Sequence, residues 1–299
     1  MVIYLLDHGA HVNHTDEKGQ TPIFLAAKSS FAELVQLLIN RGADLHRATT
    51  DGWTPIHFSY DHVETTRVLV ENGVDVKRVA NYFTPLYLAA SNNYPEVVKV
   101  LLSPGTNLEI QRSDGSYQKG FTALTVATLY GHTEVARLLL EAGANVNHQS
   151  MNNSFPLQYA VYNNREDLVR TLMEYHPNLD LMDDAGDTAL NCIFSTSLSI
   201  VSLLVNGGSD LKTRNNMGQT PLHRVVMSEN LEIMKYLIAK KAELNVTSGV
   251  YGEPLHSACR WSNLEVVKTL VAAGADVNLV DPLAGTPLQS ACLFWKSRE

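Results

Sequence analysis

The sequence predicts an all-α repeat fold, in which short pairs of helices follow one another along the chain. A tetrad of the Thr-Pro-Leu-His type recurs roughly every 33 residues. After each tetrad the apolar residues follow a helical spacing, and in most copies a glycine ends the second run. Neither helix of such a unit carries enough apolar surface to fold alone. The units are therefore expected to pack on one another.

The unit is clearest in residues 121–147, FTALTVATLYGHTEVARLLLEAGANVN. It predicts a short helix, a tight turn at Gly131-His132, a second helix from Thr133 and a stop at Gly143. The tetrad threonine can accept a backbone N–H at the start of the first helix, and the proline after it needs no N–H in the first turn. Glycine ends the second helix because it adopts a left-handed conformation without strain.

The second residue of each tetrad sets the register of the repeats. Eight complete repeats have these residues at positions 22, 55, 85, 123, 156, 189, 221 and 254. We predict a single array over residues 1–299, flanked by a C-terminal half-repeat at 1–13 and an N-terminal half-repeat at 286–299. The half-repeats keep apolar residues, which favours a piece of a longer array or a truncated reading frame. A short natural array with frayed ends is the alternative.

The period and the tetrad together resemble the ankyrin repeat over essentially the whole chain. The resemblance implies an α-solenoid of helix-turn-helix units joined by β-hairpin loops. It also implies a non-catalytic scaffold or adaptor that binds a protein partner in a concave groove of hairpin tips and first helices. In the same family the tetrad histidines, here His57, His223 and His256, bond to backbone and to the capping threonine of a neighbouring unit. The alternative function is a recognition module of a larger protein whose effector domain lies outside this chain.

Composition excludes several other classes of function. The net charge is −8 and no basic run is present, which argues against nucleic acid. No apolar run approaches the ~20 residues of a membrane span, so no direct membrane insertion is expected. Three widely spaced cysteines form no disulfide framework, which predicts an intracellular protein of the cytoplasm, with the nucleus left open.

The sequence predicts no catalytic residue, cofactor, metal site or small-molecule substrate. It contains no phosphate-binding glycine loop, no HExxH and no GxSxG. The 11 histidines invite an enzyme hypothesis, but the tetrad accounts for three of them. His11, His14 and Asp16 form at most a weak set of metal ligands on a terminal hairpin.

Candidate binding residues lie two positions before the anchors, where a hairpin side chain is expected to face the groove. Three consecutive repeats have large aromatic residues there: Trp53, Phe83 and Phe121. Tyr130 and Tyr162, late in their first helices, are expected to extend this stripe. Exposed neighbouring aromatic side chains are typical of binding hot spots. The alternative is that each aromatic packs only on its own hairpin.

Two further features adjoin or supplement the stripe. Five extra residues around Ser113–Tyr117 are expected to lengthen a two-stranded finger by ~7–10 Å and to bring Tyr117 beside the groove. Alternatively, they are an insertion without functional effect. Arg260 and Trp261 form a second candidate surface on a later first helix, where no neighbouring residues of the same kind are expected.

Overall fold

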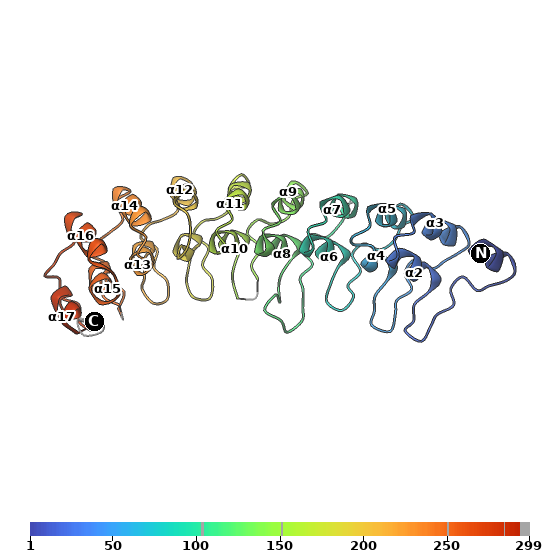
Figure 1. Ribbon diagram of the computed structural model, residues 1–299, viewed down its shortest axis with the longest axis horizontal. Coiled ribbons are helices and arrows are strands. Elements are labelled where there is room, and N and C mark those ends of the chain that lie inside the picture. Colours follow the sequence, from blue (N-terminus) through green and yellow to red (C-terminus); the bar gives the residue numbers. More distant parts are fainter. Residues whose placement is uncertain (103–104, 151, 250, 284, 294–299) are drawn as a thin grey trace. The chain divides into compact units, whose positions relative to one another are not determined.

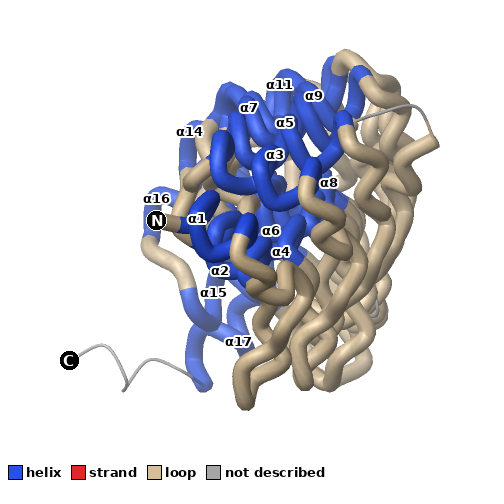
Figure 2. The backbone as a smooth tube through the Cα atoms, turned by 90° about the vertical axis from the view of Figure 1, so that its right-hand side faces the viewer, coloured by secondary structure: helices blue, strands red, loops and turns tan. Residues whose placement is uncertain are grey.

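The computed structural model describes residues 1–102, 105–150, 152–249, 251–283 and 285–293. These residues form two compact units, 1–151 and 152–299, each built from successive pairs of helices (Figure 1). Figure 2 shows that in the first unit the connecting loops gather on one side of the helices. Within the described residues the hairpins contain no β-strand beyond two isolated bridges, Ala80–Phe83 and Asp281–Gly285.

In the first unit, helices begin at the predicted anchors. Its first helices are α2 (Pro22–Lys28), α4 (Pro55–Phe58), α6 (Pro85–Ser91) and α8 (Ala123–Tyr130). Its second helices are α1 (Val2–Asp7), α3 (Ala32–Asn40), α5 (Val63–Glu71), α7 (Pro95–Leu101) and α9 (Thr133–Glu141). The assignment of residues 1–13 to a half-repeat stays a prediction.

The second unit repeats this order with one shortened element. Its first helices are α10 (Pro156–Tyr162), η1 (Ala189–Cys192), α13 (Pro221–Met227), α15 (Pro254–Trp261) and α17 (Pro287–Leu293). Its second helices are α11 (Glu166–Met173), α12 (Leu198–Asn206), α14 (Leu231–Ala239) and α16 (Leu264–Ala272). The short η1 is a single 3₁₀ turn. The missing anchor proline does not explain it, since Ala123 also lacks proline and starts the full helix α8. Residues 294–299 of the terminal half-repeat lie outside the described residues.

Small residues let the first helices pack closely. Ala26 and Ala27 of α2 and Ala89 and Ala90 of α6 are all buried, and α2 contacts both α3 and α4. Longer apolar side chains of the second helices, such as Val35 and Leu38, fill the space between the rows. Burying such a side chain contributes about 1.5–3 kcal/mol. The core is therefore a thin layer shared by adjacent repeats.

The second helices end in the left-handed conformation that the repeat predicts. Gly143 has a φ of +92°, and a Cβ added there would meet no atom within 4 Å. His176 occupies the equivalent position with a φ of +49°. A residue with a Cβ is strained in this region by about 1–2 kcal/mol. His176 therefore keeps the left-handed backbone of the repeat although it is not a glycine.

The tetrad histidines connect each repeat to the next hairpin. Nδ1 of His57 accepts a hydrogen bond from the backbone N–H of Thr54 at 3.3 Å, so Nε2 carries the proton and donates to the carbonyl of Arg78 at 3.0 Å. His223 repeats this arrangement with Thr220 and Gly252. The threonine belongs to the same repeat, so the expected bond to a neighbouring unit's threonine is wrong. It is the carbonyl that belongs to the next hairpin.

Other side chains make the same connection in the second unit. Gln158 accepts from the backbone N–H of Phe155 at 2.9 Å and donates to the carbonyl of Asp187. Asn191 donates to the carbonyl of Gln219 at 3.2 Å. The bridge therefore needs one acceptor and one donor, and an imidazole is only one way to supply them.

Replacing His57 and His223 with glutamine should reduce the loss of stability in acid. Burial lowers the pKa of His57 and of His223 to about 4. The unfolded chain binds these protons below a pKa of 6.5, so the free energy of unfolding falls as the pH drops from 6.5 towards 4, by about 2 kcal/mol per histidine at pH 5. Urea unfolding of the His57→Gln, His223→Gln variant at pH 7 and pH 5 should show a smaller difference than the wild-type chain. An equal difference would contradict the bridging role assigned to the neutral imidazoles.

The substitution His176→Gly should raise the free energy of unfolding by about 1 kcal/mol, because it relieves the left-handed strain. Gly143→Ala is the matched control at the equivalent position. Since open space surrounds that Cβ, its effect is confined to the backbone, and we expect a loss of similar size. The urea midpoint of each variant measures the change. A lower midpoint for His176→Gly would show that the register of the repeats is wrong there.

Candidate functional site

Aromatic side chains of two adjacent hairpins stack against each other in the first unit. The rings of Trp53 and Phe83 have centroids 6.1 Å apart and planes inclined by 21°. Phe58, on α4, lies edge-on to Trp53 at 5.4 Å. All three side chains are partly exposed. The structure thus brings together two of the three predicted stripe residues and adds one that sequence reasoning missed.

Phe121 does not belong to this exposed stripe. It is only 1% exposed, so its predicted place on the surface is wrong. Its backbone accepts a hydrogen bond from the N–H of Arg112 at 2.9 Å, and its own N–H bonds to the carbonyl of Gln118 at 3.0 Å. These bonds hold Phe121 at the base of the inserted loop rather than at a free hairpin edge.

The five extra residues lie where the sequence placed them but do not form a two-stranded finger. Most other described hairpins close between residues four apart, such as Thr49 and Trp53, and one closes between Ala80 and Phe83, whereas this loop closes between Arg112 and Phe121. Figure 1 shows the longer loop that precedes α8. The Asp114 carboxylate accepts hydrogen bonds from the guanidinium of Arg112 and from the hydroxyl of Ser116. The loop is therefore wound around one carboxylate instead of being extended.

A buried glutamine joins this loop to two helices. Oε1 of Gln118 accepts hydrogen bonds from the hydroxyl of Tyr87 at 2.9 Å and from Arg112. Its Nε2 donates to the hydroxyls of Tyr130 at 2.7 Å and Tyr117 at 3.1 Å. All four bonding positions of the amide are used. Burial raises the pKa of Tyr87 to about 12, so this phenol stays a neutral donor.

The same loop contacts the stacked rings. The guanidinium of Arg112 lies over the ring of Phe83, 4.6 Å from its centroid, a distance typical of cation–π attraction. Tyr117 is 75% exposed and Tyr130 43% exposed. We call Trp53, Phe58, Phe83, Arg112, Tyr117 and Tyr130 the aromatic surface.

A charged histidine holds the far end of the inserted loop. His148 is buried, with Nε2 2.9 Å from the carbonyl of Gly120 and Nδ1 3.0 Å from the Glu109 carboxylate. Both partners are acceptors, so both ring nitrogens must carry protons. Burial alone lowers the pKa of this imidazole, but the bonds to Glu109 and Gly120 outweigh it, and the pKa is raised. The residues that shape the aromatic surface are thus held by an imidazolium.

The remaining predicted residues lie in the second unit. Tyr162 is exposed on α10, and its place in a binding site stays a prediction. Trp261 is also exposed, and Arg260 lies beside its ring. The expectation that this pair has no similar neighbour is wrong, because Tyr251 meets Trp261 edge-on at 5.5 Å. Tyr251 precedes α15 on the hairpin, so only the folded chain brings the two rings together.

The described residues provide little chemistry of other kinds. They contain no group of three or more His, Cys, Asp or Glu side chains placed to hold a metal, which removes the set of His11, His14 and Asp16. Burial raises the pKa of the Cys192 thiol to about 12, so it is not a thiolate nucleophile near neutral pH. Among the helices of the described chain, none combines the length and apolar character that crossing a membrane requires.

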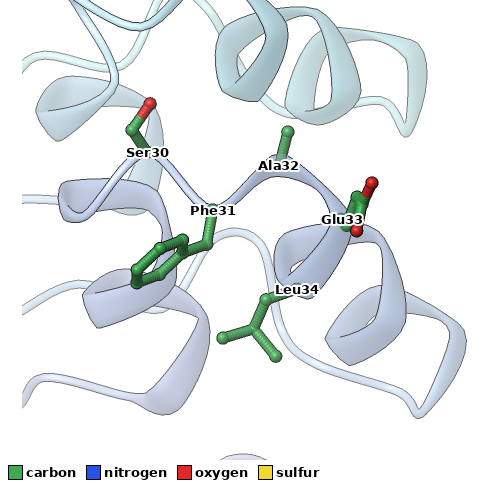
Figure 3. Close-up of a pocket in the computed structure, with 5 residues that line it drawn as sticks. All are labelled: Ser30, Phe31, Ala32, Glu33 and Leu34. Atoms are coloured by element: carbon green, nitrogen blue, oxygen red, sulfur yellow. The ribbon is translucent and has the colours of Figure 1, made fainter.

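A hollow of about 530 Å³ lies beside the turn between α2 and α3 (Figure 3). Phe31 and Leu34 project to the same side there, and Glu33 is the one titratable lining residue. All lining residues come from the single stretch 30–34. A ligand site normally gathers a few convergent polar groups. This hollow therefore makes a weaker candidate than the aromatic surface.

A family model described as ankyrin repeats (three copies) matches residues 1–80, 44–114, 77–150, 143–215 and 191–281. The overlapping matches extend over most of the sequence. The chain therefore belongs to the ankyrin-repeat family, whose repeats are generally protein-interaction modules.

Two individual relatives are no more than 29% identical to this chain over the aligned residues, and both are longer proteins. The B-cell lymphoma 3 protein homolog of Mus musculus is 28% identical over 212 residues, which cover 68% of this chain and 39% of that protein. Ankyrin repeat protein OPG189 of variola virus is 29% identical over 126 residues, 38% of this chain and 23% of the viral protein. The chain thus spans well under half the length of these two relatives.

Solved structures agree on the fold. The crystal structure of the ankyrin repeat domain of Bcl-3 aligns with a TM-score of 0.65 at 27% identity, over 74% of this chain and 99% of that one. The human ASB11 ankyrin repeat domain aligns with a TM-score of 0.62 at 24% identity, over 74% and 98% of the two chains, and supports the fold alone.

The variant Gln118→Ala should loosen the inserted loop. It removes four hydrogen bonds and leaves the buried Tyr87 hydroxyl without its acceptor, which destabilises the fold by about 1–3 kcal/mol. Hydrogen exchange of the backbone amides in residues 112–121 should become faster than in the wild-type chain. Lys119→Ala, an exposed neighbour, is the control and should leave the exchange unchanged. Equal protection in both variants would show that the glutamine does not order the loop.

Proposed function

We propose that this chain is a non-catalytic scaffold or adaptor that binds a protein partner through the aromatic surface of its first unit. The observation that carries the proposal is the stack of Trp53 on Phe83. The guanidinium of Arg112 lies over the Phe83 ring, and Gln118 accepts a hydrogen bond from Arg112. Tryptophan, tyrosine and arginine are the side chains most enriched at binding hot spots. Membership of a family of interaction repeats supports the same class of function.

The side chains of the aromatic surface are already restricted in conformation, which favours binding. Each aromatic side chain has only two side-chain torsions, and neighbouring rings or the Gln118 amide already restrict them. A partner then loses less affinity to the ordering of this side of the interface. Partial exposure leaves ring area to be buried, while the tyrosine hydroxyls remain at the rim for polar contacts.

The second candidate is a recognition module within a larger protein. It is favoured by the share of the relatives that the chain covers, 39% of the murine Bcl-3 homolog and 23% of the viral protein. In this case the aromatic surface would bind the partner, and an effector domain outside these residues would act on it. Long-read sequencing of the transcript tests this candidate. In-frame stop codons on both sides of the coding region for residues 1–299 would contradict it.

The double variant Trp53→Ala, Phe83→Ala should abolish partner binding. Each truncation at a hot spot removes about 2 kcal/mol of binding free energy, so the affinity of the double variant should fall by roughly a thousandfold. A partner recovered by affinity purification with the wild-type chain would be titrated against both the wild-type chain and the double variant by calorimetry. Circular dichroism would confirm that the double variant keeps its fold.

The matched control is Phe31→Ala, since Phe31 is a 59% exposed aromatic residue of the same unit outside the aromatic surface. It should bind the partner as the wild-type chain does. Loss of binding in Phe31→Ala with normal binding in the double variant would move the site to the hollow beside α3.

A further inference from the structure

Charge is distributed unevenly between the two rows of helices in the first unit. Its first helices α2, α4, α6 and α8 carry one charged residue at neutral pH, Lys28, and no carboxylate. In contrast, each second helix from α3 to α9 has a glutamate in its first turn: Glu33, Glu64, Glu96 and Glu134. These positions suit the positive end of each helix dipole. With Glu71 and Glu141 these helices carry six glutamates against three cations, Arg67, Lys99 and Arg137, so this row remains net negative. The two rows thus differ in sign although the whole chain has a net charge of −8.

Lys28 lies next to the aromatic surface. Its ammonium nitrogen is 5.5 Å from the centroid of the Phe58 ring, which in turn meets Trp53. The side chain is exposed and, within the part of the chain that the structure describes, pairs with no carboxylate. Asp61, in the turn after α4, contacts His62 at 3.3 Å instead.

Arg112, the cation that lies over Phe83, is already paired. Its Nε and one terminal nitrogen bond to Asp114, and the other terminal nitrogen bonds to Gln118. Arg112 therefore supports the surface, while the charge of Lys28 remains available to a ligand. A partner placed across the rings of Trp53 and Phe83 would meet this ammonium group at one edge.

We infer that the partner segment is an acidic peptide, with a large apolar side chain on the Trp53–Phe83 stack and a nearby carboxylate on Lys28. The inference rests on the proposed function and names the chemistry of its partner. Such a segment would be repelled by the glutamate-rich row and attracted to the lysine, so that the charge pattern directs it to the aromatic surface. A basic segment would be attracted to the wrong row.

A peptide-display selection tests the inference with random peptides in place of the natural partner. The full chain would be immobilised and a library of random 12-residue peptides selected in 50 mM NaCl. The recovered pool should have a net negative charge, with Asp or Glu close to Trp, Phe or Leu. The most enriched peptide, synthesised with a fluorophore, then serves as the probe. Its affinity should fall at least threefold in 300 mM NaCl, because part of its binding is ionic.

Charge reversal identifies the contact. Lys28→Glu should weaken the probe at least tenfold, whereas Lys99→Glu, on α7 of the other row, changes the net charge equally and should alter the affinity less than twofold. A copy of the probe with Asn and Gln in place of Asp and Glu should bind both variants alike.

The outcomes separate this inference from the proposed function. A neutral or basic pool, an affinity independent of Lys28, or a library without binders would overturn the acidic-segment inference. If such a neutral or basic pool still lost binding in Trp53→Ala, Phe83→Ala, the proposed function would stand on its own. If an acidic pool bound the double variant as well as the wild-type chain, the proposed site would be wrong. Both ideas hold if acidic probes lose affinity in Lys28→Glu and in the double variant.

Discussion

In the repeats that carry it, the buried polar side chain three residues after the cap of the first helix is the constraint on which the hairpin depends. His57, Gln158 and His223 stand at this position, whereas Phe24 of α2 stands there without a polar group. The polar side chain accepts a hydrogen bond from the N–H of its own cap and donates to a carbonyl of the next hairpin, as His57 does between Thr54 and Arg78. Both groups are removed from water, so leaving either unpaired would cost about 1–3 kcal/mol. One side chain thus fixes the hairpin relative to the first helix. It thereby fixes where the residue two before the next anchor, such as Phe83, lies.

The third repeat meets this constraint differently, and the aromatic surface results from the difference. Tyr87 stands where His57 stands in the repeat before it, and its hydroxyl lies at the end of a longer side chain. It donates to the side chain of Gln118 rather than to a hairpin carbonyl. The five extra hairpin residues are what bring Gln118 there. A longer side chain and a longer loop therefore compensate each other, and the loop also delivers Arg112 to the ring of Phe83.

Sequence reasoning succeeded where the structure depends on local periodicity. The anchors predicted where helices begin, and the repeat predicted a left-handed residue at the end of the second helix, a conformation that His176 also adopts. Trp53 and Phe83 could be paired because equivalent hairpin positions recur at one spacing. The burial of Phe121 and the position of Gln118 could not be predicted, because both depend on the path of a loop that has no counterpart in the other repeats. The regular repeat thus predicts the fold, whereas the candidate site forms around an inserted loop that the repeat does not predict.

Acid has opposite effects on the stability of two parts of the first unit, because His57 is buried as a neutral side chain and His148 as a charged one. His57 is neutral in the folded chain, so protons favour unfolding of the bridge it makes. His148 lies between two acceptors and is charged, with a raised pKa, so its contribution is complete below the unfolded pKa of 6.5 and is lost only as the pH rises through the folded value. Acid therefore weakens the regular repeat first, while the inserted loop that supports the aromatic surface keeps its tether at Gly120.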